Sequence, residues 1–319
     1  MFVGNVCWRC LLSDVGVNRT CFSYIVQLNS VIKMNLTTLR KQLSPILGSV
    51  AAVLLLTLTT QIGGVVYLAC LPIFRFFNEK FGRRIIRIAL RISVFCLFYC
   101  FTTFIIVPPL AEHFGRVPMP SGDDNPHVRE LNFIHVLTNR TYVVPQLREV
   151  VETAAERLAK VYPEVVVTYL DCGFPFFDGF PLKPHLSHDD GRKIDISFFY
   201  TDAATQQPTA ERPSWLGYGV CEEPRAGEEN RAEFCRAQGA WQYSFMKNYV
   251  IPQGKKHDLP FDALRTRDLM RAFLIDNRVQ FLLIEAHLKK RLDFERVGKV
   301  KIPPCNSVRH DDHLHVAIY

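Results

Sequence analysis

Charged residues are absent from two long stretches of this 319-residue sequence. Residues 42–74 contain no Asp, Glu, Lys or Arg over 33 positions, and residues 92–111 contain none over 20. A helix that crosses a bilayer needs roughly 20 mostly apolar residues, and uncharged runs of this length are unusual in soluble proteins. The sequence therefore predicts a transmembrane helical hairpin over residues 46–111, with two buried core helices as the alternative.

Acidic residues are scarce in the first third of the chain. Residues 1–110 carry 11 Lys or Arg and 2 Asp or Glu, for a charge of +9, whereas residues 111–319 carry 27 and 29, for a charge of −2. Because the excess lies in the predicted membrane part, it does not suggest a nucleic-acid partner. Six of the basic residues lie between the two uncharged stretches: Arg75, Lys80, Arg83, Arg84, Arg87 and Arg91.

Short basic loops stay in the cytoplasm. A hairpin with a cytoplasmic turn predicts a protein of the inner (cytoplasmic) membrane whose C-terminal domain faces the periplasm or cell exterior. Residues 1–33 lack the order of a signal peptide, so we expect residues 1–45 to be an N-terminal extension, with Met34 as an alternative start. Residues 112–142 are polar and contain several prolines, which predicts a linker. A folded domain then occupies residues 143–319.

Several catalytic signatures are missing as well. The sequence has no Gly-rich phosphate loop, no Gly-x-Ser-x-Gly turn and no Cys–His nucleophile pair. Four cysteines fall in the C-terminal region, and a domain outside the membrane permits two disulfides. The nearest local pair is Cys221–Cys235, which would leave Cys172–Cys305 as the second; four free thiols are the alternative.

The C-terminal region has the pattern of an α+β fold. Helical spacing or composition predicts helices at 145–160, 262–275 and 286–292, and short apolar runs predict strands at 165–170, 193–200, 279–285 and 313–318. Because the helices do not alternate with the strands as βαβ units, we expect a small antiparallel sheet with flanking helices. Residues 201–259 predict an extended loop region whose aromatic residues either line a groove or pack beneath it: Trp215, Tyr218, Trp241 and Tyr243.

The domain does contain two clusters of His and Asp, about 115 residues apart. They are Ser-His-Asp-Asp-Gly-Arg-Lys-Ile-Asp at 187–195 and Arg-His-Asp-Asp-His-Leu-His-Val at 309–316. His313 and His315 alternate along the last predicted strand and therefore share a face. His188 and Asp195 are seven residues apart, so they can meet only if the chain turns, and Gly191 supplies a place for that turn.

Two imidazoles, one carboxylate and an open fourth position are the ligand set of a catalytic zinc ion. Such a site acidifies a water molecule toward neutral pH, and a further His can act as base or stabilise an oxyanion. The two clusters supply these residue types, with His185 as an alternative ligand to His188. The neighbouring aspartates are expected to orient the imidazoles: Asp189, Asp190, Asp311 and Asp312.

The pattern His188-x6-Asp195 with His313-x-His315 resembles the zinc peptidase superfamily of lysostaphin-type enzymes, D-Ala-D-Ala peptidases and hedgehog-type domains. The tail from His310 to Val316 is closer still to the penicillin-insensitive murein endopeptidases, which cut peptide cross-links of peptidoglycan. The resemblance implies that His188, Asp195 and His315 bind Zn2+, that His313 is the catalytic base or oxyanion stabiliser, and that His310 is a second active-site His. It implies a membrane-anchored zinc metallopeptidase, a hydrolase acting on peptidoglycan peptides.

One departure from that family supports a second hypothesis. The family commonly has a small residue two positions before the Asp, where this chain has Lys193, and strand alternation places Lys193 on the face of Asp195. A catalytically inactive domain of the same fold, binding the cell wall or a partner protein, is therefore the alternative. A D-Ala-D-Ala dipeptidase or carboxypeptidase is disfavoured, because those relatives usually carry Glu-x-Trp-His at the final ligand and this chain has Asp312-His313-Leu314-His315.

Overall fold

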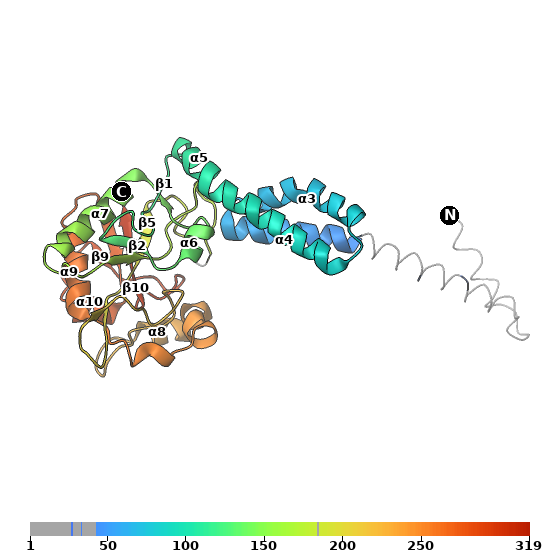
Figure 1. The fold of residues 1–319 in the computed structure, drawn as a ribbon. Coiled ribbons are helices and arrows are strands. Elements are labelled where there is room, and N and C mark those ends of the chain that lie inside the picture. Colours follow the sequence, from blue (N-terminus) through green and yellow to red (C-terminus); the bar gives the residue numbers. More distant parts are fainter. Residues whose placement is uncertain (1–26, 28–32, 34–42, 184) are drawn as a thin grey trace, which may run out of the picture. The chain divides into compact units, whose positions relative to one another are not determined.

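The computed structural model describes residues 27, 33, 43–183 and 185–319 (Figure 1). Most of the expected extension over residues 1–45, with Met34, falls outside these residues. Within the described part, helices and a mixed sheet form an α+β chain, which confirms the predicted class.

Within the described residues, two helices are long and apolar enough to cross a membrane, Leu43–Thr60 and Arg84–His113. The second is continuous from α4 (Arg84–Phe101) through the π-helical turn η1 (Thr102–Ile106) to α5 (Val107–His113). Pro108 and Pro109 lack the N–H groups that would bond four residues back, which accounts for an irregular turn just before them. The two predicted candidate spans are thus present as helices.

A further helix, α3 (Gly63–Lys80), lies between these two in the chain and packs against α4. It follows a break at Gln61, whose φ is +65°. The Gly63 N–H donates to the Thr60 hydroxyl at 2.8 Å, and a Cβ on Gly63 would lie 2.7 Å from that oxygen, so a side chain does not fit. The uncharged stretch 42–74 is therefore divided between two helices rather than forming one.

Of the six basic residues between the uncharged stretches, two lie near the end of α3, Arg83 lies in the turn, and three lie in the first turns of α4. Only residues 81–83 separate the two helices, so the predicted basic loop is a tight turn flanked by basic helix ends. Arg91 donates to Asn78, and its guanidinium lies 5.8 Å from the centre of the Phe74 ring. This side chain of α4 therefore contacts two residues of α3.

Residues 112–142 contain regular structure where a linker was expected. They include β1 (Val117–Pro118), β2 (Val128–Glu130) and α6 (Phe133–Leu137), whose first turn is capped by the side chain of Asn132. β1 pairs with β3 (Tyr142–Val143), and β2 joins the main sheet. Only residues 114–116 separate α5 from β1. The folded domain therefore begins almost directly after the second apolar helix.

The main sheet has six strands in the order β2-β4-β5-β10-β8-β9. Besides β2, it consists of β4 (Val167–Tyr169), β5 (Lys193–Ser197), β8 (Val279–Leu283), β9 (Val300–Lys301) and β10 (His313–Ile318). Pairing is antiparallel from β4 to β8, but β2 pairs with β4 and β9 with β8 in parallel. The expected antiparallel sheet is thus the centre of a mixed one, because the two short edge strands carry no sequence signal of their own.

One face of the sheet forms the hydrophobic core. Ile194, Ile196, Leu314 and Val316 are fully buried there, beneath α7 (Pro145–Ala159) and α9 (Ala263–Leu274). These helices match predicted ones, as does α10 (Ala286–Arg291). The polar residues of β5 and β10 therefore lie on the opposite face of the sheet.

Residues 200–259 contain short elements separated by loops. These are β6 (Tyr200–Thr201), β7 (Pro208–Thr209), α8 (Arg231–Ala237), η2 (Trp241–Ser244), η3 (Met246–Val250) and η4 (Gly254–Lys256). A disulfide joins Cys235 on α8 to Cys305, with the Cα atoms 5.2 Å apart. Both predicted pairings are therefore wrong, and Cys172 and Cys221 are buried free thiols. Sequence proximity favoured a local pair, whereas packing places α8 beside a segment 70 residues away.

Candidate metal centre

The pairing of β5 with β10 places Asp195 opposite His315 and Ser197 opposite His313. The side chains of directly paired residues lie on the same face of a sheet. The shared face predicted for the two imidazoles is thus observed, with the carboxylate beside them. All three side chains are nearly inaccessible to solvent.

His188 reaches this face from the loop before β5. The turn at Gly191 has a φ of +66°, which glycine adopts readily. Nδ1 of His188 lies 2.7 Å from the Cys172 carbonyl oxygen. Because a carbonyl only accepts, this nitrogen carries the proton and Nε2 keeps a free lone pair. The backbone of Cys172 thereby fixes the ring in the tautomer that a metal ligand would need.

Three candidate ligand atoms converge at the centre of the site. Nε2 of His188 lies 3.1 Å from Nδ1 of His315 and 3.2 Å from Oδ1 of Asp195, and the last two atoms are 2.9 Å apart. A tetrahedral zinc ion with ligands at 2.0–2.1 Å separates them by about 3.3 Å. Two of the three atoms are acceptors, so a proton or a cation must lie among them. The group could hold a metal ion with little adjustment.

A second group, His185, Asp195 and His313, could also hold a metal ion. Nδ1 of His185 lies 2.5 Å from Oδ2 of Asp195, but Nε2 of His313 is 3.6 Å from Oδ1. This group is therefore less regular than the first, and the two groups share a single carboxylate. His185 keeps its place as the alternative ligand that the sequence suggested.

Tyr218 holds the outer oxygen of Asp195. Its hydroxyl donates to Oδ2 at 2.9 Å and accepts from the buried N–H of Asp171 at 3.2 Å. Burial, helped by the nearby carboxylates of Asp171 and Asp195, raises the pKa of Tyr218 well above its usual value, so the phenol remains a donor at neutral pH. With Oδ2 fixed, Oδ1 faces His188 and His315.

Glycines on both sides of Tyr218 make this contact possible. Gly217 and Gly219 have φ values of +85° and +84°, and a Cβ on Gly217 would lie 2.4 Å from the Leu170 side chain. The sequence placed Tyr218 in a groove or beneath a loop without linking it to Asp195. The flanking Gly-Tyr-Gly was the available signal, since two glycines mark a close backbone approach.

His313 is oriented by its neighbour in the chain. Nδ1 of His313 lies 2.5 Å from Oδ1 of Asp312, whose other oxygen accepts the Gly219 N–H at 2.5 Å. Nε2 of His313 is buried without a partner and faces Asp195. Burial alone would lower the pKa of His313, but the carboxylates of Asp195 and Asp312 outweigh it and raise the pKa to about 9. A cation on Asp195 would offset that carboxylate and lower the pKa again.

The other predicted residues occupy definite places. The His310 ring lies 4.8 Å from that of His313, centre to centre, and its Nδ1 lies 2.9 Å from the Val308 carbonyl oxygen. It therefore borders the site without touching Asp195. Lys193 does not enter the site, because its amine pairs with Asp190 at 2.5 Å at the start of β5. The departure from the family pattern at this position thus leaves the ligands free.

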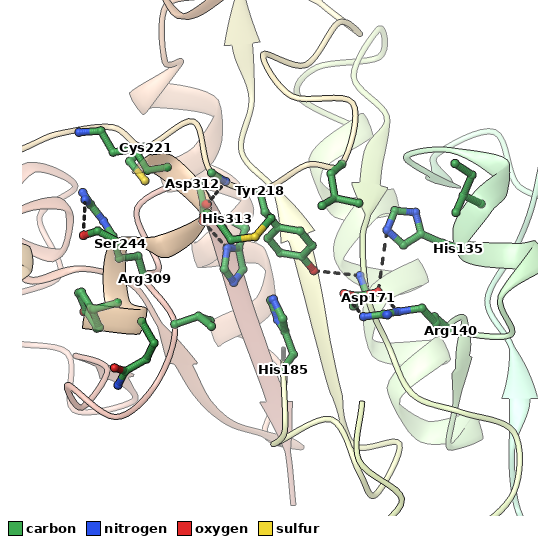
Figure 2. Close-up of a pocket in the computed structure, with 18 of the residues that line it drawn as sticks. His135, Arg140, Asp171, His185, Tyr218, Cys221, Ser244, Arg309, Asp312 and His313 are labelled. Atoms are coloured by element: carbon green, nitrogen blue, oxygen red, sulfur yellow. Dashed lines mark hydrogen bonds and ion pairs between the residues drawn. The ribbon is translucent and has the colours of Figure 1, made fainter. Parts of the chain in front are cut away.

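A cavity of about 250 Å³ borders the second group through His185 and His313, whereas none of His188, Asp195 and His315 lines it. His185, Tyr218, Asp312 and His313 form one part of its lining (Figure 2). On the other side of Tyr218 lies Asp171, in a paired contact with Arg140 at 2.7 and 2.8 Å. The cavity gives a small ligand direct access to the imidazole of His313.

No protein-family model matches this chain, and no curated protein sequence matches it.

Proposed function

We propose that this chain is a membrane-anchored zinc metallopeptidase that hydrolyses peptide cross-links or stem peptides of peptidoglycan. The observation that carries the proposal is the triangle of ligand atoms from His188, Asp195 and His315, with sides of 2.9–3.2 Å, on a buried face. His313 lies 3.6 Å from this carboxylate and lines the adjoining cavity. The resemblance of the tail from His310 to Val316 to murein endopeptidases supplies the substrate class.

His188, Asp195 and His315 would hold the metal. A bound zinc ion supplies Lewis-acid activation of water and of a substrate carbonyl. His313 would accept the proton lost by water through Nε2, since Asp312 engages its Nδ1. The same imidazole, once protonated, would donate toward the departing amine. Tyr218 and Cys172 keep the ligands in place while this proton moves.

The apolar helices support the membrane anchor. The basic turn between α3 and α4 favours a cytoplasmic position, and with that orientation the end of Arg84–His113 and the domain would lie outside. The disulfide Cys235–Cys305 agrees with an oxidising compartment. A domain on the outer side of the cytoplasmic membrane has access to cell-wall peptides.

The test uses the full chain in detergent. We expect one zinc per chain and chelator-sensitive cleavage of cross-linked muropeptides. His313→Ala should keep zinc and lose cleavage, whereas the control His257→Ala, at an exposed position outside the site, should change neither. Zinc binding without cleavage would favour the alternative, a binding module of the same fold; absence of zinc would refute the ligand assignment.

The two candidate ligand groups are separated by a second pair of variants. His188→Ala should abolish stoichiometric zinc binding, while His185→Ala should retain it, because only the first removes a corner of the compact triangle. Zinc content measured by mass spectrometry decides between them. If His185→Ala lost its zinc and His188→Ala retained it, the metal would belong to the group of His185, Asp195 and His313.

A further inference from the structure

Two cavities border the same short segment of chain, residues 59–62. Thr59 lines the cavity at the candidate metal centre. Gln61 and Ile62 line a second cavity, a groove of about 300 Å³. Since consecutive Cα atoms are about 3.8 Å apart, at most about 8 Å separates Thr59 from Gln61. The metal-centre cavity and the groove are thus neighbours along the chain.

The groove is lined almost wholly by apolar side chains. One wall comes from the start of α3, one from the stretch between Thr102 and Leu110, and the end from three aromatic rings, those of Phe114, Phe176 and Phe177. Val65 and Phe177 on its rim are 68% and 60% exposed. The wall on the second apolar helix runs over nine residues, Thr102 to Leu110, whose ends are about 12 Å apart. It lies in the half of the uncharged run 92–111 that is nearer the domain.

Hydrogen bonds hold the domain against these helices. The Tyr99 hydroxyl donates to the Leu137 carbonyl at 2.6 Å, and the Phe176 N–H donates to Oε1 of Gln61 at 3.1 Å. The short connection of residues 114–116 leaves little reach. If the apolar helices lie in a bilayer, the metal centre stays at the membrane surface, and its substrate must come there.

We infer that the groove binds the hydrocarbon tail of a lipid-anchored substrate whose peptide head group occupies the metal-centre cavity. The inference rests on the proposed function and narrows its substrate class to peptides attached to a membrane lipid. Exposed apolar walls continuous with a membrane helix favour a hydrocarbon chain over any polar occupant. Thr59 and Gln61 line different cavities but lie at most about 8 Å apart, a distance that one extended molecule can span.

The test compares two probes with the full chain in vesicles of phosphatidylethanolamine and phosphatidylglycerol. One is a soluble cross-linked muropeptide, and the other is the same muropeptide carrying a palmitoyl chain. Ile106→Trp fills the groove, and Ile105→Trp is its control, because Ile105 is the adjacent residue, is 59% exposed, and does not line the groove. The protein with native sequence should show a KM lower by on the order of tenfold for the lipidated probe. Because the tail already lies in hydrocarbon in the vesicle, this gain comes from packing against the groove walls and not from removing methylene groups from water.

Ile106→Trp should lose this preference while its KM for the soluble probe is unchanged; Ile105→Trp should keep it. A preference of equal size in all three proteins would overturn the inference, since co-localisation in the vesicle explains it without the groove. Equal KM values for both probes in the native sequence would overturn it as well. Cleavage of neither probe would instead refute the proposed peptidase activity, so the two failures are distinguishable.

Discussion

Removing the hydroxyl of Tyr218 tests the physical account of the metal centre most directly. Tyr218→Phe deletes the donor to Oδ2 of Asp195 and leaves the Asp171 N–H without its acceptor, while the ring remains. Loss of a contact that orients a metal ligand weakens metal affinity by about 10- to 100-fold, or about 1.4–2.7 kcal/mol. Leaving a buried donor unpaired destabilises the fold by about 1–3 kcal/mol.

The matched control is Tyr243→Phe. Tyr243 is equally buried, and its hydroxyl bonds to Glu285, not to a metal ligand. We expect both variants to melt at lower temperature without zinc, but only Tyr218→Phe to weaken zinc binding. Zinc affinity is measured by competition with a chromophoric chelator, and stability by thermal unfolding with the metal removed. Native zinc affinity in Tyr218→Phe, or equal weakening in both variants, would refute the role assigned to Tyr218.

Three further predictions concern stability. Cys305→Ser opens the disulfide with Cys235, which closes a loop of 70 residues, and should cost about 4 kcal/mol by chain entropy, measured by denaturant unfolding. The hydrogen bond from Arg291 lowers the pKa of Glu228 to about 2, so its stabilisation is present above about pH 4.5 and is lost as the pH falls toward 2. The melting-temperature advantage of the native sequence over Glu228→Gln should shrink across that window; a constant difference would contradict the ion pair. Gly191→Ala should destabilise the fold by about 1–3 kcal/mol, because alanine is strained at a φ of +66° and its Cβ would clash with the buried Arg116 guanidinium. It should also reduce zinc content, because this turn positions His188.

The sequence determined the parts whose signal is local. Uncharged length identified two apolar segments, because a bilayer span is defined by composition over about 20 residues, but it did not predict that the first segment divides into two helices. Strand alternation placed His313 and His315 on one face, and glycine at position 191 marked the turn. The main helices followed from spacing or composition, and the sheet's antiparallel centre followed from the order of helices and strands.

Tertiary structure decided what depends on contacts between distant segments. The edge strands β2 and β9 have three and two residues, too short for a pattern, and owe their pairing to their neighbours. The disulfide partner of Cys235 was fixed by the packing of α8, not by spacing. Tyr218 became part of the site only because its loop crosses β5, where its hydroxyl meets Asp195. The period of a sequence pattern predicts which face of a strand or helix a residue occupies. Which residue of another segment it contacts depends on how the whole chain packs.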